Sequence, residues 1–329
     1  MQGRWKRGPS FASGRVIVDL LSITVVIPTY GREQVLLDTI NQFVDQRPAP
    51  TEILVIDQTR LHEEETERNL RSLQEKGAIK WIRLYKPSQP GALNVALMES
   101  TQPIILFVDD DIRIVPGFVN AHSRNYCDEA VWAVAGQVLQ PDHDEVSGLP
   151  RPDDDGPFSD LDFPFNSSSK TFVRNGMSGN LSVRRERAIQ IGGFDENFLS
   201  PVSYRFDADF CKRLCREGGR IVFEPAARIY HLRHGRGGTR SRGSHLTSAS
   251  AMHGVGDYYF ALRQGLSLRS TWYILKRPFR QVRTKFHLRH PWWIPIKFVG
   301  EIRALFIAVS LFRRGPVYIN REERGKEQP

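Results

Sequence analysis

The sequence predicts an α/β fold in which helices cover both faces of a mainly parallel central sheet. The first observation is that short apolar runs, such as residues 23–27 and 104–108, alternate with segments of helical spacing. Runs that are apolar throughout are typical of strands buried on both faces. The second observation is that each connecting segment is long enough for a crossover helix, and such crossovers are almost always right-handed.

The first half of the chain reads as four strands and three helices in alternation. Val35, Leu36, Ile40, Phe43 and Val44 recur at helical spacing and define the first of the three helices. The order of the elements makes this half a βαβαβαβ series. Strands are expected at residues 23–27, 52–56, 79–85 and 104–108, and helices at 32–45, 62–76 and 91–99.

The second half is less regular, because a stretch rich in Asp, Gly, Pro and Ser interrupts it at residues 141–170. A loop of this length is either functional or a solvated insertion, and the sequence leaves both readings open. Around this loop we expect helices at 116–126, 184–191 and 207–217, strands at 131–139, 171–173, 180–183 and 220–224, and an extended segment at 227–231.

Charge divides the 329-residue chain into regions. The net charge is +9, but from Arg233 onward 19 Lys and Arg stand against 5 Asp and Glu, so this end carries +14 and residues 1–232 carry −5. An acidic body with a basic end argues against nucleic acid as a partner and for an anionic surface or ligand. We expect a basic N-terminal tail at residues 1–21, an α/β domain at 22–243, and a basic, aromatic-rich helical region at 244–329.

The C-terminal region interleaves aromatic with basic side chains. Trp272, Trp292 and Trp293 lie among Lys and Arg, and the apolar stretch 304–312 is bounded by arginines. This stretch is shorter than the roughly 20 residues that a membrane-spanning helix needs. The composition suits a helix lying in a membrane interface, and the alternative is that the aromatic residues pack onto the α/β domain.

The cysteines bear on the cellular compartment in which the protein is expected. Cys127, Cys211 and Cys215 form no CxxC pair, so neither a disulfide framework nor a zinc site is suggested. The N-terminal stretch lacks the continuous apolar core of a secretory signal. We therefore expect a cytoplasmic protein, with peripheral contact to the inner face of the membrane as a further expectation from its basic end.

Three consecutive carboxylates, Asp109, Asp110 and Asp111, follow the apolar run at residues 104–108. Like charges this close raise one another's pKa unless a cation compensates them, and hard divalent ions prefer carboxylate oxygens. At the carboxyl end of a strand in an α/β sheet, such a cluster indicates a nucleotide or phosphate site. The alternative is a solvated turn, where Asp is also common.

Other polar residues follow neighbouring strands and should lie at the same edge of the sheet. Pro28, Thr29 and Tyr30 end the first strand, Asp57 ends the second, and Asn94 lies in the helix after the third. A nucleotide laid across this edge would have its base bonded by Asp57 and walled by Thr29 and Tyr30. Its diphosphate would then reach a metal held by the aspartates.

Six motifs, in this order along the chain, resemble those of a known protein family. They are Val25 to Tyr30 (VVIPTY), Leu54 to Asp57 (LVID), Gly91 to Asn94 (GALN), Phe107 to Asp111 (FVDDD), Gly179 to Arg185 (GNLSVRR) and Gly192 to Glu196 (GGFDE). Together they look like the family 2 glycosyltransferases, over about residues 23–231. The resemblance implies a GT-A fold, an inverting reaction and a UDP-, GDP- or dTDP-linked sugar donor. It also implies Mg²⁺ or Mn²⁺ held by a D-x-D motif, matched by Asp109 and Asp111, with Asp110 between them as a donor contact.

The resemblance also implies a catalytic base on the acceptor side. The family's acidic motif after Gly-Gly-Phe-Asp reads Glu-Asp-x-Asp, and Phe206-Asp207-Ala208-Asp209 occupies that place here. Asp207 is the expected base, which would take a proton from the acceptor hydroxyl. Asp209 is the alternative, and helix capping is the structural reading for either residue. Phe206 departs from the usual Glu.

A histidine in related enzymes faces the metal or the diphosphate. His231 matches that position, and His234, in the basic glycine-rich loop that follows, competes with it. This loop could fold over the donor phosphates, or it could be a flexible linker. Asn180 and Ser182, on a predicted strand, are expected to help form the sugar or acceptor pocket.

The sequence thus predicts an inverting, metal-dependent glycosyltransferase that acts on a hydroxyl of a glycan or lipid-linked acceptor, in glycan, polysaccharide or glycolipid synthesis. Two other classes remain as alternatives. A nucleotidyltransferase on a sugar phosphate should carry a glycine-rich phosphate loop after the first strand, which residues 28–32 do not supply. A non-enzymatic basic protein that binds membrane or nucleic acid leaves the acidic strand edge unexplained.

Overall fold

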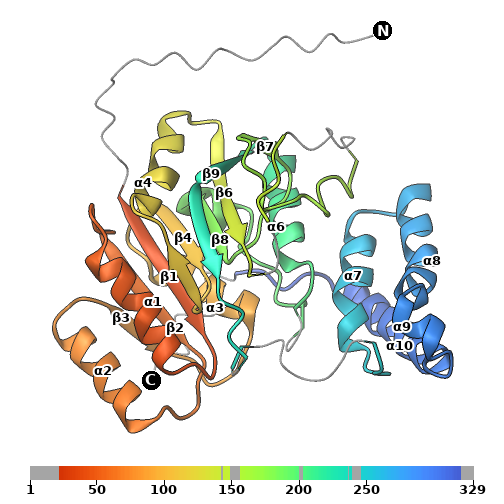
Figure 1. Ribbon diagram of the computed structural model, residues 1–329. Helices are drawn as coiled ribbons and strands as arrows, with labels where there is room; N and C mark the ends of the chain where they lie inside the picture. Colours follow the sequence, from red (N-terminus) through yellow and green to blue (C-terminus); the bar gives the residue numbers. More distant parts are fainter. Residues whose placement is uncertain are drawn as a thin grey trace, which may run out of the picture.

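The computed structural model describes residues 22–141, 144–148, 156–199, 203–235, 237–238 and 246–319. The predicted N-terminal tail at residues 1–21 lies outside the described residues, as does part of the predicted loop at 141–170. The described parts form one sheet flanked by helices, followed by a group of C-terminal helices (Figure 1).

The first half folds as the predicted parallel series. Strands β1 (Ile23–Thr29), β2 (Glu52–Asp57), β3 (Lys80–Arg83) and β4 (Ile104–Val108) lie in the order β3-β2-β1-β4, and every pair among them is parallel. The connections are the helices α1 (Gln34–Asp45), α2 (Glu64–Glu75) and α3 (Gln89–Glu99).

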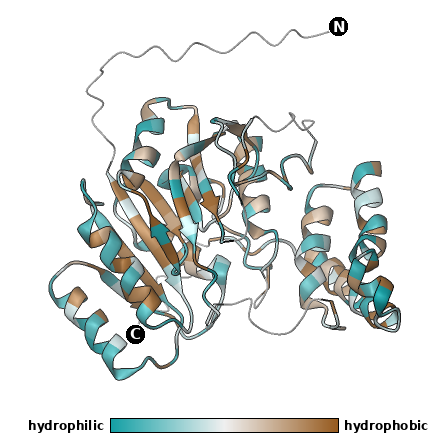
Figure 2. Cartoon of the chain, in the orientation of Figure 1, coloured by the Kyte–Doolittle hydropathy of each residue, from teal (hydrophilic) through white to brown (hydrophobic). Residues whose placement is uncertain are grey.

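Helices cover both faces of this parallel half, as predicted. Leu36, Ile40 and Phe43 of α1 pack with one set of strand side chains, and Leu93 and Leu97 of α3 pack with the alternate set. Strands β1, β2 and β4 are largely apolar in Figure 2 because they are buried on both sides, whereas β3, at the edge of the sheet, is partly exposed. The α/β class is therefore confirmed.

The second half of the sheet is mixed rather than parallel. Strand β8 (Asn180–Arg184) runs antiparallel to both β4 and β6 (Val131–Leu139), and β6 runs parallel to β9 (Arg220–His231). Two short strands, β5 (Ile112–Ile114) and β7 (Thr171–Val173), pair antiparallel with β9. The helices here are α4 (Phe118–Ser123), with a 3₁₀ turn η1 at Arg124–Cys127, then α5 (Arg185–Gln190) and α6 (Phe206–Arg216).

Two details of the second half differ from the sequence-based prediction. The strand expected at 220–224 and the extended segment expected at 227–231 form one strand, because a bulge between Glu224 and Arg228 carries the pairing with β6 past Pro225. Strand β5 was not predicted, and its three residues directly follow the aspartates that end the apolar run of β4.

The C-terminal region is helical, as predicted. It contains α7 (Met252–Arg263), α8 (Leu268–Val282), α9 (Lys285–Arg289) and α10 (Trp293–Arg314), which lie to one side of the sheet (Figure 1). Helix α7 packs into the main core through Tyr258, Tyr259 and Phe260. None of the described helices combines the length and apolar character required to span a bilayer.

Candidate active site

A cleft of about 440 Å³ opens at the carboxyl edge of the sheet. It is lined by the ends of strands β1 and β4, the last residue of β9, the segment after β9 and the start of α6. Of the residues predicted for the site, those that line this cleft are Pro28, Thr29, Tyr30, Asp109, Asp110, Asp111, Asp207, His231 and the competing His234.

The pairing of β5 with β9 brings His231 to the aspartates. Ile112 lies opposite His231 in this ladder, so the imidazole reaches back to the residues just before Ile112. Its Nε2 atom lies 3.3 Å from Asp111 Oδ1 and 3.6 Å from Asp109 Oδ2. The three side chains predicted as metal ligands therefore converge from two strands that are far apart in the sequence.

Arg32 is a residue of the site that was not predicted. Its guanidinium bridges two carboxylates, with Nε 3.1 Å from Asp110 Oδ1 and Nη2 3.0 Å from Asp111 Oδ2. Its Nη1 atom donates to the backbone oxygen of His234 at 2.8 Å. The side chain is only 8% exposed, so these are desolvated, charge-assisted contacts. An arginine of the same chain thus supplies part of the positive charge that the aspartates need.

The three aspartates have different environments. Thr29 Oγ1 donates to Asp110 at 2.8 Å, and burial raises the pKa of Asp110 to about 7 despite the opposing charge of Arg32. Burial acts in the same direction on Asp111, but hydrogen bonds and charge from His231, His234 and Arg32 hold its pKa below the usual value. Asp109 is the most exposed of the three, with 38% of its side chain accessible.

Asp109, Asp111 and His231 lie close enough together to contribute ligands to a divalent cation. Adjacent ligands of one octahedral Mg²⁺ or Mn²⁺ lie about 3 Å apart, which the two separations of 3.3 and 3.6 Å approach. As they stand, however, no three acidic, histidine or cysteine side chains among the described residues are placed so that they could hold a metal ion by themselves. Such a site would be completed by phosphate oxygens and water, as is usual for Mg²⁺.

Asp207 lies in the first turn of α6 and lines the same cleft. The backbone N–H of Ser178 donates to Asp207 Oδ1 at 3.1 Å. The next residue, Gly179, lies against Asp109, where an added Cβ would be 2.2 Å from Oδ2. Two neighbouring residues of one loop therefore contact the predicted base and a predicted metal ligand.

Asp209, the alternative base, lies outside the lining formed by the described residues. It is buried, and its Oδ2 accepts from Arg213 Nε at 2.7 Å in an ion pair within α6. Arg213 also donates to the backbone oxygens of Ile191 and Gly193. Asp209 therefore has a structural role: through Arg213 it ties α6 to the loop after α5.

Asp57 is fully buried at the end of β2 and does not line the cleft formed by the described residues. Its carboxylate accepts from Trp81 Nε1 at 3.0 Å and from the backbone N–H of Thr59 at 2.8 Å, and it lies 2.9 Å from His62 Nε2. The other ring nitrogen of His62 lies 3.1 Å from Glu33. Although burial disfavours the cation, these carboxylates raise the pKa of His62, and His62 and Thr59 lower the pKa of Asp57.

Asn94 also lies outside the described lining. Its amide bonds both the N–H and the carbonyl of Phe194 and donates to Glu196, so it locks α3 to the Gly192 to Glu196 loop. Asn180 and Ser182 lie outside the described lining of this cleft as well. Both are buried and bonded to His122. In a strand whose two faces are covered, these polar residues bond other protein groups.

The sequence of the chain matches a family model. The model is that of "Glycosyl transferase family 2", and it covers residues 24–189, about half of the chain. The chain belongs to glycosyl transferase family 2. It is therefore a glycosyltransferase, and the nucleotidyltransferase and non-enzymatic alternatives are set aside. No curated protein matches this family 2 glycosyltransferase significantly by sequence.

Solved structures resemble this family 2 glycosyltransferase at low identity. GalNAc-T7 with UDP, GalNAc and Mn²⁺ has a TM-score of 0.57 at 13% identity, over 80% of this chain and 58% of that one. The mannosyltransferase PcManGT from Pyrobaculum calidifontis, in complex with GDP-Man and Mn²⁺, has a TM-score of 0.52 at 18% identity, over 91% and 80%. S. aureus TarS, residues 1–349, has a TM-score of 0.53 at 16% identity, over 91% and 93%. These likenesses confirm the predicted GT-A fold.

Proposed function

We propose that this glycosyltransferase moves a sugar from a nucleotide-diphosphate donor to a hydroxyl of a glycan or lipid-linked acceptor, with inversion at the anomeric carbon. The observation that carries the proposal is the meeting of Asp207 and the group Asp109, Asp111 and His231 in one cleft. The similar structures of GalNAc-T7 and PcManGT hold UDP and GDP-Man respectively, which supports a nucleotide-sugar donor here.

Asp207 is the proposed general base. An inverting transfer needs a carboxylate on the face of the sugar opposite the leaving diphosphate, so that the acceptor oxygen loses its proton as it attacks. Asp207 is partly exposed in the cleft and is held by the Ser178 N–H, which orients the carboxylate. Asp209, by contrast, is buried and engaged by Arg213, which supports the choice of Asp207.

Asp109, Asp111 and His231 are the proposed ligands of a divalent cation, Mg²⁺ or Mn²⁺. When bound, the cation would neutralise charge that develops on the departing diphosphate. His231 is favoured over His234 because its imidazole faces both carboxylates, whereas the His234 ring lies 3.3 Å from Arg32 Nη1. Mn²⁺ in the GalNAc-T7 and PcManGT structures supports a divalent metal.

Pro28, Thr29 and Tyr30 are proposed to wall the nucleotide, since all three line the cleft beside the aspartates. We keep Asp57 as the contact to the base; because its carboxylate is fully buried outside the described lining, this contact requires a base N–H to displace a present donor such as Trp81 Nε1. Both Asp110 and Asn94 contact protein groups through their side chains. In this scheme they therefore affect the donor indirectly, by positioning neighbouring residues. A UDP-, GDP- or dTDP-linked donor fits the proposal.

We place the reaction in glycan, polysaccharide or glycolipid synthesis in the cytoplasm, at the inner face of the membrane. The basic end of the chain and its exposed aromatic residues support this location. An acceptor carried in the membrane would then be presented to an enzyme already docked there.

The test compares Asp207→Asn with Asp209→Asn. We expect Asp207→Asn to bind UDP and Mn²⁺ as the unchanged protein does, by calorimetry, and to transfer sugar about 10² to 10⁴ times more slowly, because it lacks the proton acceptor. Asp209→Asn should instead lower the unfolding temperature, since it breaks the ion pair with Arg213. Full transfer activity in Asp207→Asn, or loss of nucleotide binding in it, would refute the assignment of the base.

A further inference from the structure

Helix α8 carries an exposed apolar stripe. Leu268, Trp272, Leu275 and Phe279 recur at spacings of four, three and four residues, which places them on one side of the helix. Their exposed fractions are 92%, 64%, 58% and 64%. An aligned set of this kind differs from the singly scattered apolar residues of an ordinary surface.

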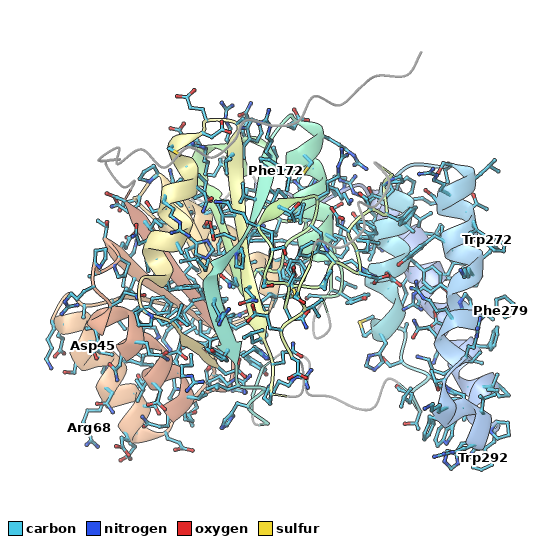
Figure 3. The ribbon with its side chains drawn as sticks, turned by 45° about the horizontal axis from the view of Figure 1, so that its top comes forward. Asp45, Arg68, Phe172, Trp272, Phe279 and Trp292 are labelled. Carbon is cyan, nitrogen blue, oxygen red and sulfur yellow. The ribbon has the colours of Figure 1, made fainter. Side chains whose placement is uncertain are left out.

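The stripe continues beyond α8. Leu288 of α9 is 77% exposed and Trp292, at the start of α10, is 61% exposed. Figure 3 shows Trp272, Phe279 and Trp292 on the side of these helices that faces away from the sheet. We call the set of Leu268, Trp272, Leu275, Phe279, Leu288 and Trp292 the outer apolar face.

Basic residues flank the outer apolar face. Residues 268–289 contain seven Lys or Arg and no Asp or Glu. The stripe positions 268, 275 and 279, and residue 282, which continues their spacing, are each followed directly by a basic residue. These basic residues, Arg269, Lys276, Arg280 and Arg283, therefore form a row beside the stripe along α8 and its C-cap. The helix therefore presents an apolar row beside a cationic row, which is the pattern of helices that lie in a membrane interface.

Three residues of this row, Arg269, Lys276 and Arg280, line a hollow of about 330 Å³ at the edge of the outer apolar face. Trp272 contributes to its wall, and Tyr273 stacks on Phe158 with ring centroids 4.5 Å apart. The other described residues around it are Pro157 and Arg277, and none of the described lining is acidic. Its cationic lining suits a phosphate group, with Arg277 and Arg280 also paired with Asp257 behind it.

The inner side of α8 already packs against the other C-terminal helices, so the outer apolar face is not the side of α8 that belongs in the core. Arg277 is buried and forms ion pairs with Asp257 of α7, at 2.7 Å, and with Glu301 of α10. Tyr273 donates to Asp257 at 2.7 Å. These contacts fix the rotation of α8 about its axis, and they leave the apolar stripe pointing outward.

We propose that the outer apolar face docks on a bilayer that contains anionic lipid, with Trp272 and Trp292 at the headgroup level and a lipid phosphate in the hollow. Charge complementarity decides this occupant, since the inner leaflet of a membrane is negative and attracts clustered Lys and Arg. A second copy of the chain would bring the six exposed cations of residues 268–289 against the same six, since Arg277 is buried, and this opposes association through this face.

Docking here would set the orientation of the catalytic cleft, and this consequence rests on the proposed function. Asp257, which pairs with Arg277 of α8, also pairs with Arg205 at 3.0 Å. Arg205 directly precedes α6, whose first turn holds Asp207. A short series of buried ion pairs therefore connects the docked helix to the proposed base, so the cleft would be held at a fixed place relative to an acceptor in the membrane.

The experiment is flotation of the full chain with phosphatidylglycerol-containing vesicles and with phosphatidylcholine vesicles. We expect binding to the first and little to the second. Trp272→Ala with Phe279→Ala should reduce the bound fraction about tenfold, because two interfacial aromatic side chains are lost. Lys276→Glu should reduce binding about fivefold or more, since each cation near an anionic surface contributes about that factor.

Matched controls lie on the catalytic body. Phe172→Ala removes an aromatic side chain that is 56% exposed on β7, and Arg68→Glu reverses an exposed charge on α2 (Figure 3). Both should bind vesicles as the unchanged protein does. Circular dichroism melting of the Trp272 and Phe279 variant would verify that its fold is retained.

Three outcomes would overturn the proposal. These are no binding to anionic vesicles, equal losses in the control variants, or conversion of a dimer to a monomer by Trp272→Ala with Phe279→Ala, since the last would assign the face to a second copy. Vesicle binding is measured without donor, and Asp207→Asn should bind vesicles normally. Failure of the docking proposal is thus separable from failure of the proposed reaction.

Discussion

At the residue scale, Arg32 changes how the acidic cluster is understood. Three adjacent carboxylates would repel one another, yet Arg32 already compensates two of them from a position nearly 80 residues away in the chain. Asp109, which is partly exposed and is not one of the two that Arg32 bridges, is left to face the cleft with one oxygen of Asp111. The arginine therefore fixes the two buried carboxylates and confines the open part of the site to Asp109, Asp111 and His231.

Replacing Arg32 tests this arrangement. Arg32→Ala leaves Asp110 and Asp111 buried without their guanidinium partner, and breaking a buried pair in this way costs about 3 kcal/mol of unfolding free energy. The value lies at the low end of the usual range because Asp110 can take up a proton. Denaturant titration monitored by fluorescence would measure the loss, and Arg32→Lys should recover only part of it because an ammonium cannot bridge both carboxylates in the same way.

A stability of Arg32→Ala equal to that of the unchanged protein would contradict the bridging role. Arg68→Ala is the matched control, because Arg68 is exposed on α2. Its removal should change the unfolding free energy by less than about 0.5 kcal/mol.

Individual residues also show where sequence reasoning succeeds and where it fails. The aspartates could be predicted, because they end a strongly apolar strand and the edge of the sheet follows from local pattern. Arg32 could not, because an arginine at a helix start has no signal for a partner so distant in sequence. Asn94 was assigned to the donor from its motif, but its partners Phe194 and Glu196 lie a hundred residues onward and become visible only in the fold.

At the element scale, the site depends chiefly on loops and strand registers, and α6 supplies Asp207 from its first turn. The β5 to β9 pairing sets His231 opposite the aspartates, and the loop before β8 sets Ser178 and Gly179 between Asp207 and Asp109. The parallel strands were predictable from their continuous apolar runs. The mixed half was less so, because three-residue strands and a bulged strand carry too little periodicity to reveal their partners.

Gly179→Ala tests the contact between this loop and Asp109. The glycine φ lies outside the left-handed range, so the backbone accepts alanine, but the new Cβ would be 2.2 Å from Asp109 Oδ2 and must displace that carboxylate. We expect Mn²⁺-dependent UDP binding to weaken about tenfold or more, as is typical when a metal-ligand position is disturbed. Calorimetry with and without Mn²⁺ would measure it. Unchanged affinity, with a normal melting temperature, would exclude Asp109 from the metal site.

At the scale of the whole molecule, the C-terminal region is integrated with the α/β body rather than appended to it. Tyr259 of α7 donates to the buried Asp195 at 2.7 Å and packs on Phe198, and Gly256 lies so close to the carbonyl of Tyr204 that a Cβ would be 2.1 Å from it. After α10 the chain returns to the body. The predicted boundary at residue 243 divides regions of different charge, and extensive packing crosses it.

The return segment, residues 315–319, gives a measurable consequence of this integration. The Val317 N–H donates to Asp195, the Val317 carbonyl accepts from Glu196, and the Ile319 N–H donates to Gly192, at 2.9 to 3.0 Å. Tyr318 also lies under the guanidinium of Arg213, 4.6 Å from its ring centroid. The last described residues of the chain therefore close the loop that Asn94 locks from the other side.

A chain that ends at Arg314 should consequently be less stable than one that ends at Ile319. The shorter chain loses at least three hydrogen bonds and the stacked tyrosine, which together contribute about 3 kcal/mol, so its unfolding temperature should fall by several degrees in calorimetry. The chain ending at Ile319 is the matched control, since it keeps every contact of the return segment, and it should melt with the full chain. If both truncations melt at the same temperature, residues 315–319 do not stabilise the body, and the C-terminal helices are held to it by their other contacts, such as those of α7 and α10 in the main core.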